Sequence, residues 1–375
     1  MNKETVKVMV VSHSYIAAEN QKNVDALSSL VQLSVVVPET INDGVFGALD
    51  ANKHSNVIAY PRISLWGVQY LLRTTDLNLR QFQPSIIHVE YDPWSIIYWQ
   101  VWLFKSLFAR KAKLICTVKN NTYRHYSGVK GRLKTAIAHF FIKRCDFFIA
   151  VNKGVQNIYD KHFKVSSSKI EVMQHLGVDT VLFSPRVNDE QGAVLNIGFC
   201  GRFNEEKGID DLLKAVTILI NQNPNITLSL IGDGEMKSEL LALNLPWLNV
   251  LERVPHNEVA AFMQTLDLFV LPSKISVEHE EHDAHALLEA MSCGVPVIGS
   301  TSGIIPEVID GNSGLLFEAG NVDDLIMQLN TLIRSEQLRE KYATMGVRRV
   351  NTYYSIDVLA KKKKQIYQQV LNSPT

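Results

Sequence analysis

The chain has 375 residues, of which 46% are hydrophobic and 20% are charged, and its acidic and basic residues balance. This length exceeds what one hydrophobic core usually holds, so we expect two domains. The four cysteines are scattered and form no CxxC pair, which argues against a disulfide framework and a thiolate zinc site and fits a reducing compartment.

The N-terminus passes directly into a strand-like run and shows no signal-peptide core. The most apolar window, residues 94–108, has only about half the length needed to cross a bilayer. Gln100 and Lys105 also interrupt it. We therefore expect a cytoplasmic protein.

Short β-branched runs alternate with helical spacing through the first half of the chain. Helical spacing appears at residues 23–30 and again at 129–141. The predicted buried strands are VKVMVVSH (6–13), LSVVV (33–37), NVIAYP (56–61), SIIHVE (85–90), KLICTV (113–118) and DFFIAVN (146–152).

The interval between Asp92 and Asp146 contains no acidic residue. Such a basic region attracts phosphates, membranes or nucleic acid, but no nucleic-acid recognition motif accompanies it. One hypothesis is that the helix predicted at 128–144 rests on an anionic membrane, at the inner membrane face, or binds an anionic acceptor. The alternative is a solvated helix face. The cations are Lys105, Arg110, Lys111, Lys113, Lys119, Arg124, Lys130, Arg132, Lys134, Lys143 and Arg144.

The strand–helix rhythm starts again after a polar stretch at 185–191. Strands that alternate with helices predict parallel sheets covered on both faces, so we expect an α/β protein with two Rossmann-like, doubly wound domains. Ligands bind such sheets at the carboxyl ends of the strands, which places the site in a cleft that the two domains face. The predicted strands of this half are LNIGFCGR (195–202), TLSLIG (227–232), LFVLPS (268–273) and PVIGS (296–300).

The motif GRFNEEKG follows the first strand of the second half. Gly201 allows the backbone to pass close to a ligand, and Arg202 and Lys207 can meet phosphate oxygens at the strand end. A helix is predicted from Ile209. The alternative is an ordinary solvated turn.

The stretch VEHEEHDAHALLEAMSCGVPVIGS (277–300) carries three histidines and a cluster of acids before a predicted helix that ends at Gly294. It could be a metal site or a solvated acidic loop, but HEEH is not the HExxH pattern of zinc enzymes. A helix N-terminus at 283–286 offers free N–H groups to a phosphate. Glu281 and Glu289 flank it and could accept hydroxyl hydrogen bonds, so we favour a sugar-nucleotide clamp without metal.

These motifs together resemble the retaining GT-B glycosyltransferases, the large family that includes bacterial mannosyl- and glucosyltransferases and sucrose-phosphate synthase. Glu281-x7-Glu289 matches the paired-glutamate motif of the family, and GRFNEEKG matches its arginine–lysine diphosphate motif. Further matching segments are LLEAMSCGVPVIGS, LIGDGEMKSEL, LDLFVLPS and IEVMQHLGVDTVLFSP. The resemblance is strong over 180–350 and weak before it.

The resemblance implies roles for individual residues. Arg202 and Lys207 neutralise the donor diphosphate, and Glu281, counted with them as catalytic, holds hydroxyls of the transferred sugar. Glu289 binds the ribose. The other donor-side residues are Gly201, the base-side Arg253 and Val254, and the loop and helix start formed by Asp283, Ala284, His285, Ala286 and Leu287.

The resemblance also implies a division of the chain. Residues 1–187 form an acceptor-binding domain, 188–350 a nucleotide-sugar-binding domain, and 351–375 a helix that crosses back to the first domain. The acceptor-side candidates, which lie at the ends of predicted strands, are His13, Glu90, Lys119 and Asn120.

The activity implied is a hexosyltransferase, in polysaccharide or glycoconjugate biosynthesis, that moves a hexose from a nucleotide diphosphate sugar to a hydroxyl of a saccharide, lipid-linked or small acceptor. UDP- or GDP-sugar is the expected donor, with no cofactor and no metal. The chain departs from the family at Asp283–Ala284, where Phe-Gly is common, and at Lys119, where a histidine is common. A non-catalytic nucleotide-sugar-binding regulatory partner is therefore the alternative, and a nucleotide-sugar epimerase of similar fold is a third hypothesis.

Overall fold

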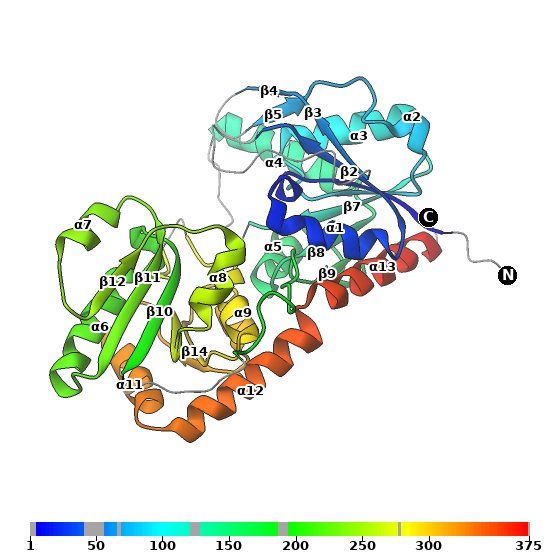
Figure 1. Ribbon diagram of the computed structural model, residues 1–375. Coiled ribbons are helices and arrows are strands. Elements are labelled where there is room, and N and C mark those ends of the chain that lie inside the picture. Colours follow the sequence, from blue (N-terminus) through cyan, green and yellow to red (C-terminus); the bar gives the residue numbers. More distant parts are fainter. Residues whose placement is uncertain are drawn as a thin grey trace. The chain divides into compact units, whose positions relative to one another are not determined.

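The computed structural model describes residues 5–40, 56–65, 69–120, 128–186, 194–276 and 279–373, with the side chains of 128–131 and 134 excepted. The chain divides into two compact units, residues 1–177 with 356–375 and residues 178–355. Each unit is an α/β layer structure with its own parallel sheet, as the sequence predicts (Figure 1).

The sheet of the first unit has seven parallel strands in the order β3-β2-β1-β6-β7-β8-β9. The order reverses between β1 and β6, which makes the carboxyl ends of these two strands the topological switch point. The strands are β1 (Lys7–Val11), β2 (Gln32–Pro38), β3 (Val57–Tyr60), β6 (Ile86–Val89), β7 (Lys113–Val118), β8 (Phe147–Ala150) and β9 (Ile170–Val172), and a separate antiparallel hairpin joins β4 (Arg62–Ser64) to β5 (Tyr70–Leu72).

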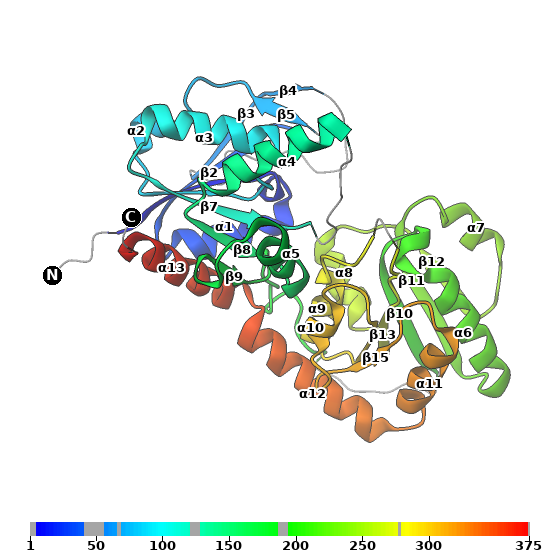
Figure 2. The ribbon, with the colours of Figure 1, turned by 180° about the vertical axis from the view of Figure 1, so that it is seen from behind.

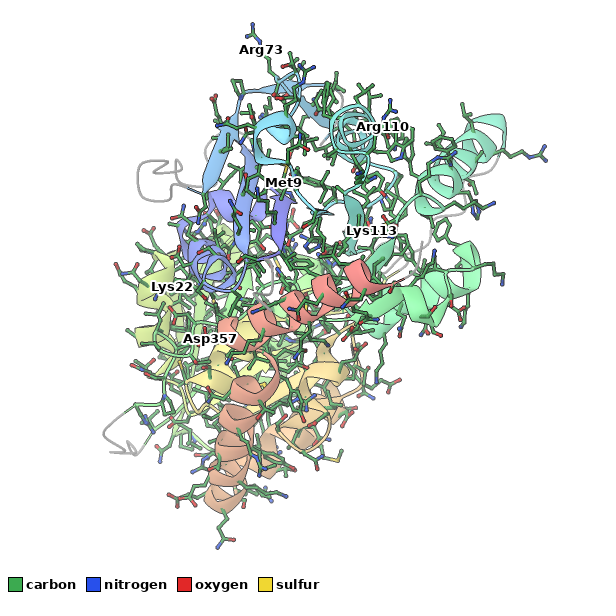
Figure 3. The ribbon with its side chains drawn as sticks, turned by 90° about the vertical axis from the view of Figure 1, so that its right-hand side faces the viewer. Met9, Lys22, Arg73, Arg110, Lys113 and Asp357 are labelled. Atoms are coloured by element: carbon green, nitrogen blue, oxygen red, sulfur yellow. The ribbon has the colours of Figure 1, made fainter. Side chains whose placement is uncertain are left out.

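Alternate residues of β1 point to opposite faces of this sheet, so both faces are apolar. Met9 and Val11 belong to one core, and Val8 and Val10 to the other; Figure 3 shows Met9 inside the unit. The first core is covered by α3 (Ile96–Phe108), α4 (Gly128–Ile142) and α5 (Lys153–Phe163), and the second by α1 (Gln21–Ser28) and α13 (Ile356–Asn372), while α2 (Leu79–Phe82) is a single turn (Figure 2).

Side-chain caps explain where several helices begin. Ser95 Oγ accepts a hydrogen bond from the N–H of Tyr98 at the start of α3, and Asn152 Oδ1 accepts from Val155 N–H at the start of α5. These bonds satisfy N–H groups that a helix leaves without internal partners.

The sheet of the second unit has six parallel strands in the order β12-β11-β10-β13-β14-β15, and its order reverses between β10 and β13. Its strands are β10 (Leu195–Arg202), β11 (Ile226–Asp233), β12 (Leu248–Leu251), β13 (Leu268–Leu271), β14 (Val297–Ser300) and β15 (Leu315–Phe317). The helices are α6 (Ile209–Gln222), α7 (Lys237–Ala242), α8 (His256–Met263), α9 (His285–Ser292), α10 (Ile305–Ile309), α11 (Val322–Ile333) and α12 (Glu336–Tyr353).

The compact units divide at Gly177 and Ser355, whereas the domain boundaries expected from the sequence lie at 187 and 350. Val178 and Phe183 are buried in the core of the second unit, so residues 178–186 pack with that unit. The functional assignment of the two domains stays a prediction. Among the described residues, no helix is both long and apolar enough to cross a membrane.

Candidate active site

The carboxyl ends of β10 and β13 bring the diphosphate-motif residues together with the acidic loop. Arg202 ends β10, next to Gly201, and its side chain is exposed. Lys207 and Glu281 meet at this edge, with Lys207 Nζ 2.5 Å from Glu281 Oε2. Ser273, which follows β13, donates a second hydrogen bond of 2.5 Å to the same oxygen. The structure thus joins three residues from separate segments into one polar set.

A glycine allows the turn that carries Lys207 to lie close to the end of β13. Gly208 has φ +69°, and a Cβ there would lie 2.0 Å from the carbonyl oxygen of Pro272. A larger residue would push the 205–207 turn, with Lys207, away from the end of β13. The backbone of GRFNEEKG therefore sets the position of its lysine.

The backbone of Glu281 is fixed from the loop after β14. Its N–H donates to Ser302 Oγ at 3.0 Å, and its carbonyl accepts from Ile304 N–H at 2.8 Å. Burial by itself raises the pKa of this carboxyl, but the Lys207 cation and the hydrogen bonds from Lys207 and Ser273 outweigh burial and lower the pKa below its ordinary value. Glu281 is thus a buried, ionised carboxylate at neutral pH.

Glu289 lies on α9, eight residues after Glu281, and is buried. Its Oε1 lies 2.7 Å from Nε2 of His256, the first residue of α8. His256 is not among the residues predicted from the sequence. The helix that carries Glu289 begins at His285 as expected, after the buried Ala284 and the exposed Asp283, and it ends before Gly294, whose φ is +73°.

The remaining donor-side predictions lie on the same unit. Ala286 is half-buried and Leu287 buried in the first turn of α9, where backbone N–H groups lack partners within the helix. Arg253 is exposed and Val254 half-buried in the segment between β12 and α8. The ligand-binding roles of these residues remain predictions.

Two of the three histidines of this stretch lie near carboxylates. His279 Nδ1 lies 3.4 Å from Glu206 Oε2, and His285 lies 3.9 Å from both Asp283 and Glu289, while His282 is exposed. Within the described ranges, no three His, Cys, Asp or Glu side chains are grouped to hold a metal ion.

The acceptor-side candidates lie at the carboxyl edge of the first unit's sheet. His13 follows β1, Glu90 follows β6, and Lys119 and Asn120 follow β7. Asn120 Nδ2 donates to Asp92 Oδ2 at 2.7 Å, and the backbone N–H of Lys119 donates to the other oxygen at 3.4 Å. Burial raises the pKa of Asp92 to about 7 and lowers that of His13 to about 4. This edge therefore combines a neutral imidazole with a carboxyl group that titrates near neutrality.

Glu90 is the centre of a buried polar cluster rather than an exposed group. Its Oε1 accepts from Tyr15 Oη at 3.0 Å and from Lys363 Nζ at 3.3 Å, and its Oε2 lies 3.5 Å from His175 Nε2. Burial lowers the pKa of His175 well below its ordinary value, so this imidazole is neutral at pH 7. Burial by itself would raise the pKa of Glu90, but the neighbouring basic groups, first His175 and then the lysines Lys363 and Lys119 among them, hold it below its ordinary value.

The residues of this cluster that are not predicted from the sequence are Tyr15, His175 and Lys363. A signal for Lys363 exists, because it lies on the apolar stripe of α13 between Leu359 and Ile366, where a lysine needs a buried partner.

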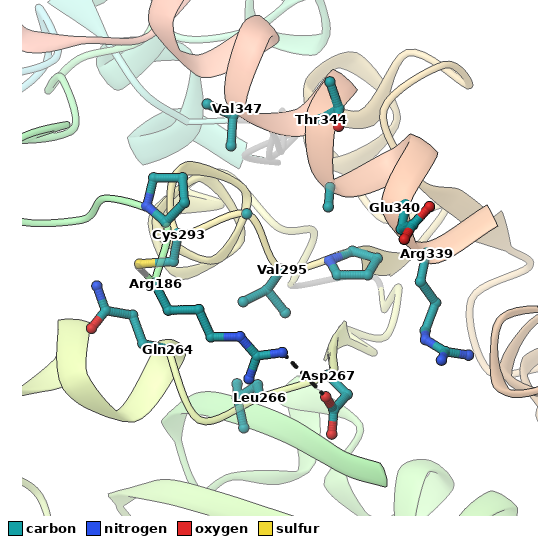
Figure 4. Close-up of a pocket in the computed structure, with 14 residues that line it drawn as sticks. Arg186, Gln264, Leu266, Asp267, Cys293, Val295, Arg339, Glu340, Thr344 and Val347 are labelled. Atoms are coloured by element: carbon teal, nitrogen blue, oxygen red, sulfur yellow. Dashed lines mark ion pairs between the residues drawn. The ribbon is translucent and has the colours of Figure 1, made fainter. Parts of the chain in front are cut away.

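A cavity of about 450 Å³ lies elsewhere on the second unit (Figure 4). Its lining includes Arg186, Asp267 and Pro296, and the first two form an ion pair at 3.9 Å. Asp267 precedes β13 and Pro296 precedes β14, so the cavity opens at the amino ends of the strands. It is therefore at the opposite edge of the sheet from Arg202, Lys207 and Glu281.

Two family models match the chain in succession. Residues 26–182 match the family described as "Glycosyltransferase Family 4", and residues 183–349 match "Glycosyl transferases group 1". With two doubly wound units of the described topology, these matches show that the chain belongs to the GT-B glycosyltransferases. The retaining mechanism and the role of the paired glutamates stay predictions.

Individual relatives agree with this family. The chain is 27% identical over 225 residues to a GDP-mannose-dependent monoacylated alpha-(1-6)-phosphatidylinositol monomannoside mannosyltransferase of Corynebacterium glutamicum, covering 56% of this chain and 59% of the relative. It is 25% identical over 309 residues to the N-acetyl-alpha-D-glucosaminyl L-malate synthase of Bacillus anthracis, covering 76% and 75%. The chain spans 59% and 53% of the length of two curated relatives that it matches.

Solved structures share the fold. The sucrose-phosphate synthase of Thermosynechococcus elongatus superposes with a TM-score of 0.74 at 17% identity, covering 97% of this chain and 99% of that one. The Anabaena protein HepE, solved with UDP and glucose, gives a TM-score of 0.69 at 18% identity over 97% and 99% of the two chains.

Proposed function

We propose that this protein is a nucleotide-sugar-dependent hexosyltransferase that transfers a hexose to a hydroxyl acceptor. The observation that carries the proposal is the polar set at the switch point of the second unit, where Lys207, Ser273 and Glu281 meet beside the exposed Arg202. Ligands of doubly wound sheets bind at this position. A cationic pair beside a buried carboxylate suits a diphosphate joined to a hydroxyl-rich sugar.

The donor we propose is a UDP- or GDP-sugar. One relative is named as GDP-mannose-dependent, and HepE was solved with UDP and glucose. The carboxylate of Glu289 and the N–H groups of the first turn of α9 lie on one helix, which would let a single element bind a ribose hydroxyl and a phosphate.

We propose that transfer retains the anomeric configuration, as in the family with the paired glutamates. The anomeric C–O bond breaks, and the diphosphate leaves with the bonding electrons. The acceptor oxygen attacks on the same face and passes its proton to the leaving phosphate. Arg202 and Lys207 would stabilise the charge that grows on the diphosphate, which is the largest single contribution to catalysis in many enzymes.

We also propose that the reaction needs no metal ion, because these two cations can supply the positive charge and His279 and His285 already face carboxylates. Activity measured with and without EDTA tests this part. Loss of activity with EDTA and recovery with a divalent ion would contradict it.

Thermal unfolding with UDP-, GDP- and ADP-sugars is the first experiment, because a ligand that binds only the folded protein raises its stability. One donor should raise Tm, and the protein should slowly hydrolyse that donor when no acceptor is present. Arg202→Ala should lower the hydrolysis rate about a hundredfold without changing Tm of the free protein. Lys214→Ala, which alters an exposed lysine on α6, is the matched control.

The alternative, a regulatory protein that binds the donor without turnover, predicts a different result. It would show the same Tm increase with no hydrolysis and no transfer to any hydroxyl acceptor. Failure of every nucleotide sugar to raise Tm would contradict both functions.

A further inference from the structure

A side-chain contact joins the first residue of α8 to the middle of α9, and the two helices lie side by side (Figure 1). Nε2 of His256 lies 2.7 Å from Oε1 of Glu289. A carboxylate only accepts hydrogen bonds, so the imidazole nitrogen carries the hydrogen and donates it. His285 Nε2 lies 3.9 Å from the same oxygen, which is too far for a hydrogen bond. His256 is therefore the side chain that holds Oε1.

The carboxylate of Glu289 has one oxygen bound to the protein and one that is open. Its side chain is only 6% exposed. Oε2 accepts no hydrogen bond from any residue that the structure describes, yet it keeps contact with solvent. A carboxylate oxygen in such an enclosed position needs a hydrogen-bond donor, because burying it without one is costly. Oε2 is thus suited to accept from a hydroxyl of a bound ligand.

The imidazole of His256 is itself held in place. Its ring centroid lies 5.1 Å from that of Phe183, which is buried in the core of the second unit. The backbone of His256 begins α8, two residues after Val254 in the segment proposed to face the base. One residue therefore connects the segment proposed for the base with the carboxylate proposed for the ribose.

We propose that His256 is a positioning residue for ribose recognition. Its hydrogen bond to Oε1 fixes the carboxylate of Glu289, so that Oε2 accepts from a ribose hydroxyl of the donor. The inference rests on the proposed function, because it needs a nucleotide whose ribose meets Glu289. Without this bond the carboxylate turns about its terminal torsion, which has broad minima, and Oε2 is no longer directed at the ligand.

The alternative is that the pair has a structural role alone and satisfies a buried carboxylate. In that case, loss of His256 would lower the stability of the free protein and leave nucleotide recognition unchanged. The two roles differ in how strongly the protein prefers a ribonucleotide over its deoxy analogues.

Isothermal calorimetry measures this preference. UDP, GDP and ADP are titrated first, and the nucleotide that binds is compared with its 2′-deoxy and 3′-deoxy analogues. The wild-type protein should bind the ribonucleotide at least about tenfold more tightly than one of these analogues, because a hydrogen bond to a charged group contributes a factor of this size.

Variants of His256 separate the hydrogen bond from the ring. His256→Phe keeps a ring against Phe183 but removes the donor, and it should reduce the preference to less than about threefold. His256→Gln, whose amide donates from a similar position, should restore most of the preference. In a Glu289→Ala background, His256→Phe should change the preference no further, because the group that it positions is gone.

His162→Phe, at an exposed histidine of α5 in the first unit, is the matched control and should leave the preference unchanged. The Tm of each free variant is measured in parallel. If His256→Phe does not fold, His256→Asn, whose shorter amide ends before Oε1, takes its place.

An unchanged preference in His256→Phe would overturn the inference and leave the structural role. Equal losses in His256→Phe and His256→Gln would also overturn it, because the ring and not its hydrogen bond would then matter. If a nucleotide binds the wild-type protein with no preference over either deoxy analogue, this inference fails while the proposed function stands. If none of the three nucleotides binds, the proposed function fails and this inference fails with it.

Discussion

Lys207, which pairs with Glu281, has one structural role and one proposed role in binding the donor. It neutralises a carboxylate whose side chain is 1% exposed, and it stands where the proposed donor would place a diphosphate. Removing one partner of a buried ion pair leaves the other charge uncompensated, which costs more than the pair itself contributes. The stability of the free protein can therefore report on this pair without any substrate.

Lys207→Met should destabilise the protein by about 3 kcal/mol at pH 7. The pKa of Glu281 is lowered in the folded protein, so its contribution to stability is present above the unfolded-state pKa and is lost as pH falls through the folded-state value. Without Lys207, burial favours the protonated acid. The difference between variant and wild type should thus be largest at neutral pH and shrink below about pH 5.

Urea unfolding at a series of pH values measures this difference. Lys214→Met, at a lysine whose side chain is 61% exposed, is the control and should change stability by less than about 0.5 kcal/mol. A loss that is independent of pH would mean that Lys207 stabilises by packing and that the ion pair is not the cause.

Loops after neighbouring strands determine where Glu281 lies. Gly303, after β14, has φ +50°, and a Cβ on it would lie 1.8 Å from the carbonyl oxygen of Glu281. Glycine is required here twice, once for the backbone conformation and once for the contact. Gly311, with φ +74°, has the first requirement alone, because no described atom lies within 4 Å of its added Cβ.

Comparing Gly303→Ala with Gly311→Ala separates these two costs. Both variants should lose about 1 kcal/mol, because an L-residue is strained in this conformation. Gly303→Ala should lose a further 1–3 kcal/mol, roughly, because the loop that holds Glu281 must shift. It should also weaken the Tm increase caused by the nucleotide sugar. Equal unfolding free energies for the two variants would show that the loop can shift without any loss of stability.

Strands that lie within longer apolar runs could be predicted from the sequence, and several short strands outside such runs could not. The runs at 113–118 and 195–202 coincide with β7 and β10, and the predicted start of α6 at Ile209 is confirmed. Three short strands, β9, β12 and β15, and the β4–β5 hairpin were missed, because segments of three or four residues show little periodicity.

The sequence predicted those parts of the candidate site that lie within a single short motif. GRFNEEKG and the paired glutamates lie together at one sheet edge because parallel strands place their carboxyl ends there. Pairs between distant segments were not predictable, since neither His256 with Glu289 nor Lys363 with Glu90 has a local sequence signal for its partner. Only tertiary packing brings these groups together.

At the scale of the whole molecule, the last helix belongs to the first unit although the second unit precedes it in the chain. Helix α13 buries Leu359, Ile366, Tyr367 and Val370 in the same core as α1 and β1. Its Lys363 also donates a hydrogen bond to the buried carboxylate of Glu90. The first unit is therefore completed only when the final residues of the helix have been added.

Ending the chain at Ser355 should consequently destabilise the first unit and leave the second folded. Burial of several large apolar side chains contributes on the order of 5 kcal/mol, which is comparable to the total stability of a domain. The truncation also leaves the buried carboxylate of Glu90 without Lys363, which adds to the loss.

Hydrogen exchange read by mass spectrometry distinguishes the two units. Amides of β1, β2 and α1 should lose protection in the truncated protein, while those of β10, β11 and β13 should keep it, because the second core contains no residue of α13. A chain ending at Ser373 retains the whole helix and is the matched control. Equal loss of protection in both sheets would mean that the two cores unfold as one, and unchanged protection in β1 would mean that α13 is not part of the first unit's stability.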